Sequence, residues 1–184
     1  MNCNIPVPET TTQYIIWSRV MHEKSIELLN KAVADELTAV HQYMYFHFHC
    51  DDQGFELLSN LFRKTAIEEM MHVEMLAERI LFLKGEVNMT LANEIQKLHS
   101  VREMLELASS MEASSVRDYN TWANESAANA DSRTKKLFEQ LVDDEERHFD
   151  QYDTEIDNLE RFGSQYLALQ SIERSKNLSS GATE

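Results

Sequence analysis

The scarcity of helix-breaking residues constrains this chain more than any other feature. Its 184 residues include only four glycines and two prolines, and both prolines, Pro6 and Pro8, lie near the N-terminus. Proline removes a helical hydrogen bond, and glycine costs roughly 1 kcal/mol in a helix interior. Three of the glycines, Gly54, Gly85 and Gly163, fall between runs of helical hydrophobic periodicity, as residues that end helices do. The sequence therefore predicts an all-α protein built from a few long helices.

The glycines divide the chain into predicted elements. We expect four long helices and a short fifth one, over residues 18–50, 55–84, 100–128, 131–163 and 164–174. Ser100 and Glu103 have the spacing of a capping box, and Asp131 or Ser132 is the expected N-cap of the fourth helix. The predicted organisation is an N-terminal arm over residues 1–17, one folded domain over 18–176 and a C-terminal tail over 177–184.

The lengths of the connections predict the topology. The turns at 51–54 and 128–131 are short, which makes the helices that they join antiparallel neighbours. A helix of about 30 residues is about 45 Å long. The 14 residues from 86 to 99 can span about 46 Å when extended. We therefore predict an antiparallel four-helix bundle in which a long crossover joins two helical hairpins.

Charge and composition exclude several classes of protein. The net charge is −15, which argues against nucleic acid as a partner because phosphate contacts need clustered Lys and Arg. The two cysteines, Cys3 and Cys50, make no disulfide framework. No basic, apolar leader opens the chain and no run of 18 apolar residues occurs, so we expect neither secretion nor a membrane span. The cytoplasm is the expected location.

The same short pattern, a glutamate three residues before a histidine, occurs in two of the predicted helices. Glu69 precedes His72, and Glu145 precedes His148. When the buried stripe of each helix is traced in steps of three and four residues, both pairs fall on that stripe. One such pair is commonplace in an acidic chain, but two pairs on core stripes call for an explanation.

The remaining two long helices each add one glutamate to the predicted core, and the spacings repeat. Glu36 lies 33 residues before Glu69, Glu112 lies 33 before Glu145, and the two halves are offset by 76. Four buried carboxylates need positive charge, and few basic side chains share these stripes. Two divalent metal ions would supply it, with two neutral imidazoles as further ligands. The predicted ligands of this di-metal site are Glu36, Glu69, His72, Glu112, Glu145 and His148.

Other candidate side chains have ordinary explanations beside the functional ones. A tyrosine follows the core glutamate by seven residues in both halves, at Tyr43 and Tyr119. Tyr43 is two turns from Glu36 on one helical face, which fits either a plain core position or a redox role beside the metal. Three further histidines, His41, His47 and His49, cluster near the end of the first helix, where surface or core roles are commoner than ligation.

Four segments resemble the bacterioferritins, a family of the ferritin-like superfamily. They are ADELTAVHQYMYF, EEMMHVEMLAERILFLKG, DDEERH and LERFGSQYLALQSIER, in the same order and without gaps between the proposed ligands. The resemblance covers about residues 20–176. The N-terminal arm is extra, His41 replaces a frequent asparagine, and the turn at Cys50 is not typical.

The resemblance implies a ferroxidase that stores and detoxifies iron. It assigns two iron ions to each subunit, with Glu69 and Glu145 as bridges and Glu36 and Glu112 as terminal carboxylates. Dioxygen or hydrogen peroxide would oxidise Fe(II) to Fe(III), which would mineralise inside a hollow homo-oligomer. A cage of 24 subunits is implied, with twelve as the alternative. An electron-donor protein is a possible partner for iron release.

Met70 is the candidate ligand of a second cofactor. It follows Glu69 directly, so it is rotated by about 100° from the core and can meet its own copy across a symmetric dimer. The resemblance places Met70 at the position of the methionine that ligates haem, which implies haem b or a related iron porphyrin at a dimer interface for electron transfer during iron release. Methionine is also a common gap-filler at helix interfaces.

Three rival functions remain. A rubrerythrin-like peroxidase would share the di-iron bundle, but it normally adds a rubredoxin module with two C-x-x-C pairs, which this sequence does not contain. A peroxide-scavenging mini-ferritin that protects DNA usually builds its site between subunits, and the charge of −15 weakens that reading. A purely structural bundle would leave four core glutamates unexplained.

Overall fold

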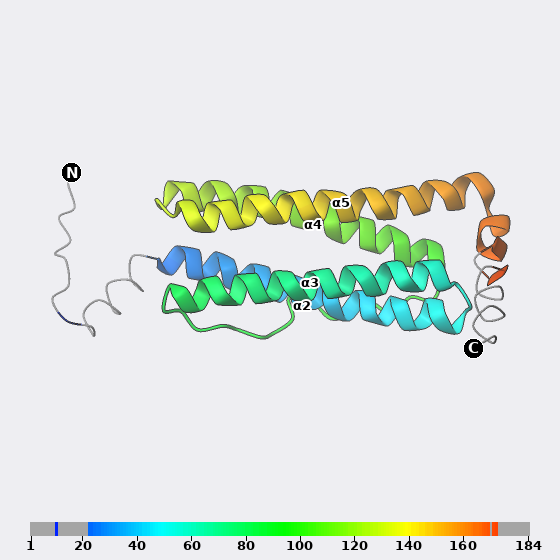
Figure 1. The fold of residues 1–184 in the computed structure, drawn as a ribbon, viewed down its shortest axis with the longest axis horizontal. Coiled ribbons are helices and arrows are strands. Elements are labelled where there is room, and N and C mark those ends of the chain that lie inside the picture. The colour runs from blue at the N-terminus through cyan, green and yellow to red at the C-terminus, as the bar shows by residue number, and fades with distance from the viewer. Residues whose placement is uncertain (1–9, 11–21, 170, 173–184) are drawn as a thin grey trace, which may run out of the picture.

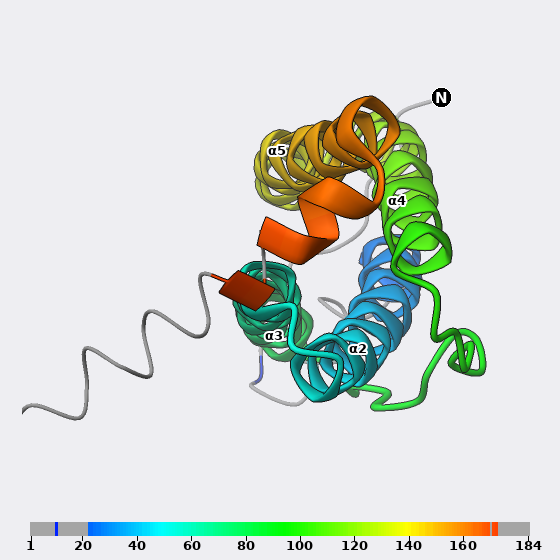
Figure 2. The ribbon, with the colours of Figure 1, turned by 90° about the vertical axis from the view of Figure 1, so that its right-hand side faces the viewer.

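The computed structural model describes residues 10, 22–169 and 171–172. Its long helices are α2 (Glu23–Asp52), α3 (Glu56–Phe82), α4 (Val101–Ala128) and α5 (Ser132–Phe162), which lie side by side along one long axis (Figure 1). Residues 164–169 form a short further helix that lies across one end of the bundle (Figure 2). The predicted all-α, antiparallel four-helix bundle with a short fifth helix is confirmed, with helix ends within a few residues of those expected.

The described residues do not cover every prediction. The predicted N-terminal arm and tail, and the proposed first turn of the first helix over residues 18–21, lie outside them. Among the helices that the structure describes, none is long and apolar enough to cross a membrane.

The bundle consists of two tight hairpins and a crossover. Helix α2 packs along α3 and α4 packs along α5, whereas contacts between the hairpins are sparse. The segment 86–99 runs back along α2 (Figure 1), as its length predicts. Three polar side chains of α2 hold it there: Asn30 and Gln42 each exchange two hydrogen bonds with its backbone, and Thr38 accepts one from the amide of Ala92 at 3.0 Å.

Two apolar clusters fill the bundle on either side of a polar layer. One cluster includes Phe46 and Phe62, and the other includes Leu29 and Phe138. All four of these side chains are fully buried. The predicted core stripes are largely buried, although five of their residues stay partly exposed: Val40, His47, Ser115, Leu137 and Ile156. The clusters close both ends of the polar layer against water.

The observed helix ends confirm two predictions and contradict one. Asp131 caps α5, since its carboxylate accepts from the amide of Thr134 at 3.0 Å, and Gly163 ends α5 with a φ of 56°. The capping box predicted for α4 is wrong, because the side chain of Ser100 makes no capping hydrogen bond. The backbone closes this turn instead, as the amide of Met104 donates to the carbonyl of Ser100 at 3.0 Å.

Ala130 occupies a conformation that favours glycine, with a φ of 58° in the turn between α4 and α5. The left-handed conformation costs an L-residue about 1–2 kcal/mol, whereas glycine loses about 0.4–1 kcal/mol through its more flexible unfolded chain. We expect Ala130→Gly to stabilise the protein by about 0.5–1 kcal/mol, measured by chemical denaturation. The control Ala113→Gly, inside α4, should lose about 1 kcal/mol. A loss at Ala130 as well would contradict this account of the turn.

Candidate metal centre

Each long helix contributes to the polar layer at the middle of the bundle. Helices α2 and α4 supply one glutamate each, and α3 and α5 supply a glutamate and a histidine each. All six residues are at most 3% exposed. They form two groups whose potential ligand atoms lie within 4.8 Å of one another. The first group is Glu36, Glu69, His72 and Glu145, and the second is Glu69, Glu112, Glu145 and His148.

The two shared carboxylates each present one oxygen to each histidine. Oε2 of Glu69 lies 2.8 Å from Nδ1 of His72, and its Oε1 lies 3.0 Å from Nδ1 of His148. Glu145 does the same, with its Oε1 3.2 Å from His72 and its Oε2 3.3 Å from His148. This is the arrangement that two metal ions bridged by two carboxylates require. One chain supplies both groups.

Several of these buried atoms lie within ion-pair distance of one another but make no hydrogen bond of acceptable geometry. They include both carboxylate oxygens of Glu69, Oε1 of Glu145 and Nδ1 of His72. An unsatisfied buried polar atom typically costs about 1–3 kcal/mol, and here several lie close together. Metal ions would satisfy them, and a set of carboxylates and imidazoles suits iron, manganese or zinc. The donor atoms therefore fit a pair of divalent ions.

Two tyrosines join the halves of the repeat. The hydroxyl of Tyr43 on α2 donates to Oε1 of Glu112 on α4 at 2.5 Å, and Tyr119 on α4 donates to Oε1 of Glu36 on α2 at 2.5 Å. Sequence periodicity related Tyr43 to Glu36 of its own helix, whereas the structure places its hydroxyl on the glutamate of the other half. Both tyrosines are fully buried, and each fixes one oxygen of a carboxylate that belongs to only one of the two groups.

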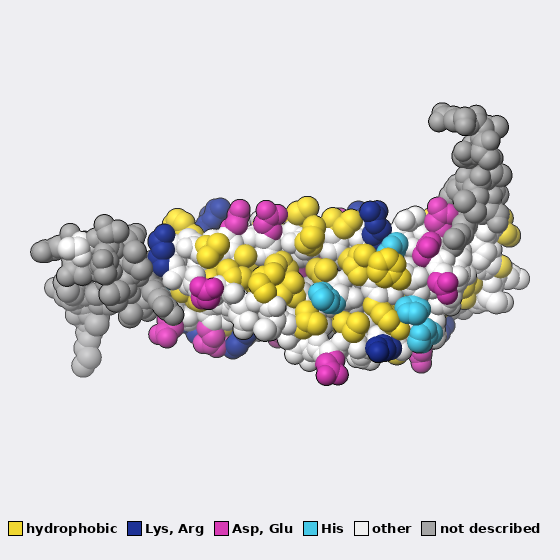
Figure 3. All heavy atoms as spheres, turned by 90° about the horizontal axis from the view of Figure 1, so that it is seen from below, with side chains coloured by type: hydrophobic (Ala, Val, Ile, Leu, Met, Phe, Trp, Pro, Cys, Tyr) yellow, Lys and Arg dark blue, Asp and Glu magenta, His cyan; other side chains and the backbone are white. Residues whose placement is uncertain are grey.

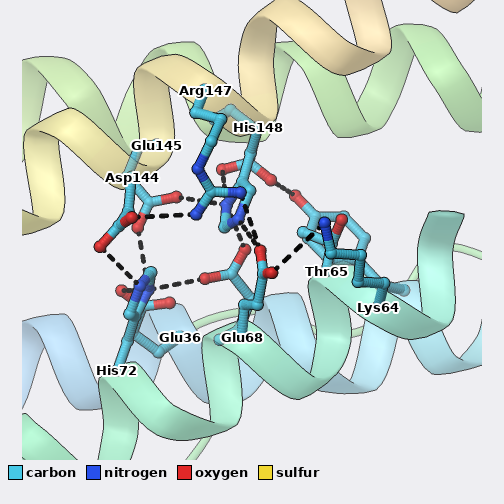
Figure 4. A network of polar contacts seen from close by, with 12 residues as sticks. Glu36, Lys64, Thr65, Glu68, His72, Asp144, Glu145, Arg147 and His148 are labelled. Atoms are coloured by element: carbon cyan, nitrogen blue, oxygen red, sulfur yellow. Dashed lines mark hydrogen bonds and ion pairs between the residues drawn. The ribbon is translucent and has the colours of Figure 1, made fainter.

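The far sides of the imidazoles face two further acids that sequence reasoning missed. Nε2 of His148 lies 2.7 Å from Glu68, and Nε2 of His72 lies 3.6 Å from Asp144. Arg147 bridges both acids at 3.0 and 2.9 Å (Figure 4). Such partners orient a metal-binding imidazole. The signal was present in the sequence, because Glu68 and Asp144 each precede the glutamate of a repeated pair and are themselves 76 residues apart.

Without metal, the centre retains protons. Desolvation and the charges of Glu145 and Glu69 raise the pKa of Glu36 well above its usual value. Desolvation and the charges of Glu69 and Glu145 do the same for Glu112. Burial alone would lower the pKa of His148, but the facing carboxylates of Glu145 and Glu69 raise it to about 10. Protons thus supply part of the positive charge that metal ions would bring.

The other candidate residues lie away from this centre. His47 contacts the hydroxyl of Ser59 at 2.9 Å, and His49 packs on Tyr45 and His99. Neither belongs to a metal-binding group among the described residues. Met70 is 51% exposed on α3. Seen from below the view of Figure 1, the face formed by α2 and α3 carries a band of hydrophobic side chains (Figure 3).

Comparisons with known proteins agree with this geometry. The model of the Ferritin family, described as a ferritin-like domain, matches residues 26–162. The bacterioferritin of Rhodobacter capsulatus is 36% identical over 147 residues, covering 79% of this chain and 91% of that protein. That of Desulfovibrio desulfuricans is 33% identical over 145 residues, covering 79% and 81%.

Two solved structures extend the likeness to three dimensions. A Desulfovibrio desulfuricans bacterioferritin, determined with its diiron site in different catalytic states, has a TM-score of 0.82 and 31% identity, covering 84% of this chain and 90% of its own. The Rhodobacter capsulatus bacterioferritin, with a metal-free dinuclear site and a haem iron in a crystallographic special position, has a TM-score of 0.78 and 34% identity, covering 81% and 93%.

Proposed function

This chain belongs to the bacterioferritin family of ferritin-like proteins, and from that premise we propose that it stores and detoxifies iron by oxidising Fe(II) at the centre inside its bundle. The observation that carries the proposal is the sharing of Glu69 and Glu145 between two groups of ligands. The direct test is rapid oxidation of Fe(II) added to the metal-free protein, followed by absorbance. A protein that oxidises Fe(II) no faster than buffer would refute it.

Six side chains would hold the iron. His72 with Glu36 would bind one ion, His148 with Glu112 the other, and the two shared glutamates would bridge them. Four carboxylates balance the charge of two divalent ions, and loading would release the protons that the metal-free centre carries. Once bound, the iron pair supplies the electrons for reducing dioxygen or hydrogen peroxide.

The surrounding residues would keep the ligands in place during this reaction. Glu68 and Asp144 would hold the distal nitrogens of the imidazoles, so that Nδ1 of each points inward. Tyr43 and Tyr119 would steady the terminal carboxylates from opposite halves. The apolar clusters at both ends would restrict water, which limits loss of partly oxidised iron from the site.

Tyr43→Phe tests the proposed role of the tyrosine hydroxyl. Its loss leaves Oε1 of Glu112 without the bond at 2.5 Å, and we expect iron turnover to slow by about tenfold, within the range for partners of ligands. Binding of two divalent ions per subunit should persist, as measured by anaerobic Co(II) titration. Phe46→Leu, in the adjacent apolar cluster, is the control for packing. Equal turnover in Tyr43→Phe and wild type would make Tyr43 an ordinary core residue.

Met70 is the proposed axial ligand of a haem between two subunits. The residue is 51% exposed on α3, as a contact across two subunits requires, and two methionine sulfurs can ligate one haem iron. The bound haem would accept electrons for the release of stored iron. In protein produced with ample haem, Met70→Leu should lose the Soret band. Met71→Leu, at a neighbouring side chain with 48% exposure, should keep it; loss in both variants, or in neither, would contradict the assignment.

We also propose a hollow homo-oligomer of 24 subunits as the functional form, with twelve as the alternative. The mineral would grow inside it, and an electron-donor protein would serve its release. The cytoplasm remains the expected compartment. Light scattering of the purified protein distinguishes about 24 from about twelve subunits, because the expected masses differ twofold.

A further inference from the structure

A cavity of about 460 Å³ lies between α3 and α5, toward the end of the bundle where α3 ends and α5 begins (Figure 1). The residues that line it follow one another at spacings of one, three or four along each helix, so each helix presents one face to the cavity. These two helices belong to different hairpins and contact each other sparsely. None of the six candidate metal ligands lines the cavity, which is therefore separate from the metal centre.

Part of the lining is apolar. Met75 and Leu137 pack against the apolar cluster that includes Leu29 and Phe138. Phe82 also lines the cavity and is 71% exposed, so its ring is available to another molecule. Pockets for small molecules typically combine such apolar walls with a few polar groups. The cavity thus offers a surface to an aromatic or aliphatic body.

Arg79 is a fixed part of the wall. Its Nη2 donates to the carboxylate of Asp131 at 2.7 Å, and its Nε donates to the hydroxyl of Thr134 at 3.0 Å. The guanidinium lies 5.1 Å from the centre of the Phe82 ring, within the range of a cation–π contact. Because Asp131 balances the charge of Arg79, the electrostatic character of the cavity depends on its other charged residues.

Two further cations of the lining have no such balance. Arg133 and Lys136 are exposed and share one face of α5. Neither forms an ion pair with another residue that the structure describes. Glu78 is the acid of the lining, and it is exposed. The first turn of α5 contains no acid, although Asp and Glu outnumber Lys and Arg by 32 to 17 in the chain. Cations near a helix N-terminus do not stabilise the helix, so these two remain available to an anion.

We propose that this cavity binds a small organic phosphate monoester, in which a dianionic phosphate group is attached to an aromatic or apolar body. The guanidinium of Arg133 and the ammonium of Lys136 would donate charge-assisted hydrogen bonds to the phosphate oxygens. The amide of Gln140 reaches only the sulfur of Met75, at 3.8 Å, and would add a neutral donor. The body would lie against Phe82. The volume is within the usual range for such ligands, about 300–1,000 Å³.

Calorimetric titration of the metal-free protein in a phosphate-free buffer tests the proposal with three probes. Phenyl phosphate should bind at one site per subunit, with a Kd on the order of 1 mM or lower. Inorganic phosphate lacks the ring and benzoate has a single negative charge, so each should bind at least about fivefold more weakly. No saturable binding of phenyl phosphate, or equal affinity for inorganic phosphate, would overturn the proposal.

Charge variants locate the phosphate group. Arg133→Gln with Lys136→Gln should weaken the binding of phenyl phosphate by about tenfold, as expected for the loss of two partly exposed ion pairs. Lys97→Gln with Arg117→Gln removes the same charge at exposed positions outside the cavity and should stay within about twofold of wild type. Glu78→Gln should strengthen binding by about twofold, because it removes a negative charge from the lining. Equal weakening in the two double variants would overturn the site, since net charge alone would then govern binding.

A second pair of variants locates the organic body. Phe82→Ala should weaken the binding of phenyl phosphate by about fivefold and leave that of inorganic phosphate unchanged, because only the ring loses a contact. Phe162→Ala is the matched control, since Phe162 is 51% exposed and Arg161 lies 5.9 Å from its ring; it should change neither affinity. An equal effect of Phe82→Ala on the two probes, including no effect, would overturn the proposed placement of the body. These measurements need no iron, so their outcome is independent of the proposed function.

Discussion

Replacing Glu69 with alanine should lower the rate of Fe(II) oxidation by at least about 100-fold and leave the oligomer assembled. Even partners outside the ligand sphere commonly contribute 10–100-fold to metal affinity or activity, and Glu69 faces both histidines at 2.8 and 3.0 Å. Its loss would remove a ligand from both ions at once. Stopped-flow absorbance at two Fe(II) per subunit measures the rate, and size-exclusion chromatography checks the assembly.

The same helix offers a matched control. Glu74 is exposed on α3, and Glu74→Ala should oxidise iron within about twofold of wild type, because surface substitutions away from special features have small effects. Glu145→Ala should behave like Glu69→Ala, since it occupies the equivalent shared position. An unchanged rate in Glu69→Ala would eliminate its assignment as a bridge.

The metal-free protein should become markedly less stable as pH rises from 6.5 to 9.5. The pKa of His148 is raised from 6.5 to about 10 by its facing carboxylates, so its contribution is complete below pH 6.5 and is lost as pH rises through 10. The pKa values of Glu36 and Glu112 are also raised, so these buried acids destabilise the fold further as they lose protons. Glu145 has a lowered pKa, but its contribution is constant in this window.

Linkage sets an upper limit on the contribution of His148 to this effect. The shift of His148 corresponds to at most roughly 5 kcal/mol, at about 1.4 kcal/mol per pKa unit. At about 2–4 °C per kcal/mol for a domain of this size, we expect a thermal midpoint at least about 5 °C lower at pH 9.5. Protein loaded beforehand with two Zn(II) per subunit should lose much less, because metal replaces the protons. An equal loss in both forms would place the titrating groups elsewhere.

The sequence predicted the helices and the six clustered acids and imidazoles because both depend on periodicity. A helix continues where the sequence has no glycine or proline. A residue that shares the period of the buried hydrophobic residues points inward in any bundle. Glu36 and Glu145 are over 100 residues apart, yet their shared register with hydrophobic neighbours places them in one layer. The ligand assignments themselves remain predictions until metal is bound.

Features that depend on which helices face each other could not be predicted from the sequence. Periodicity relates Tyr43 to Glu36, but only the packing of α2 beside α4 brings its hydroxyl to Glu112. The capping box failed for a different reason, because the spacing of Ser100 and Glu103 permits a cap without enforcing the rotamers that form it.

The most direct test of the di-metal centre is a count of iron. Metal-free protein should be titrated anaerobically with Fe(II), then exposed to dioxygen or hydrogen peroxide in separate samples, with the absorbance of the fast phase plotted against iron per subunit. The structure, with two groups of ligands that share Glu69 and Glu145, predicts a break at two Fe(II) per subunit, and loss of that break in Glu69→Ala. A fast phase that saturates at one Fe(II) per subunit, or that rises without a break, would contradict a paired centre.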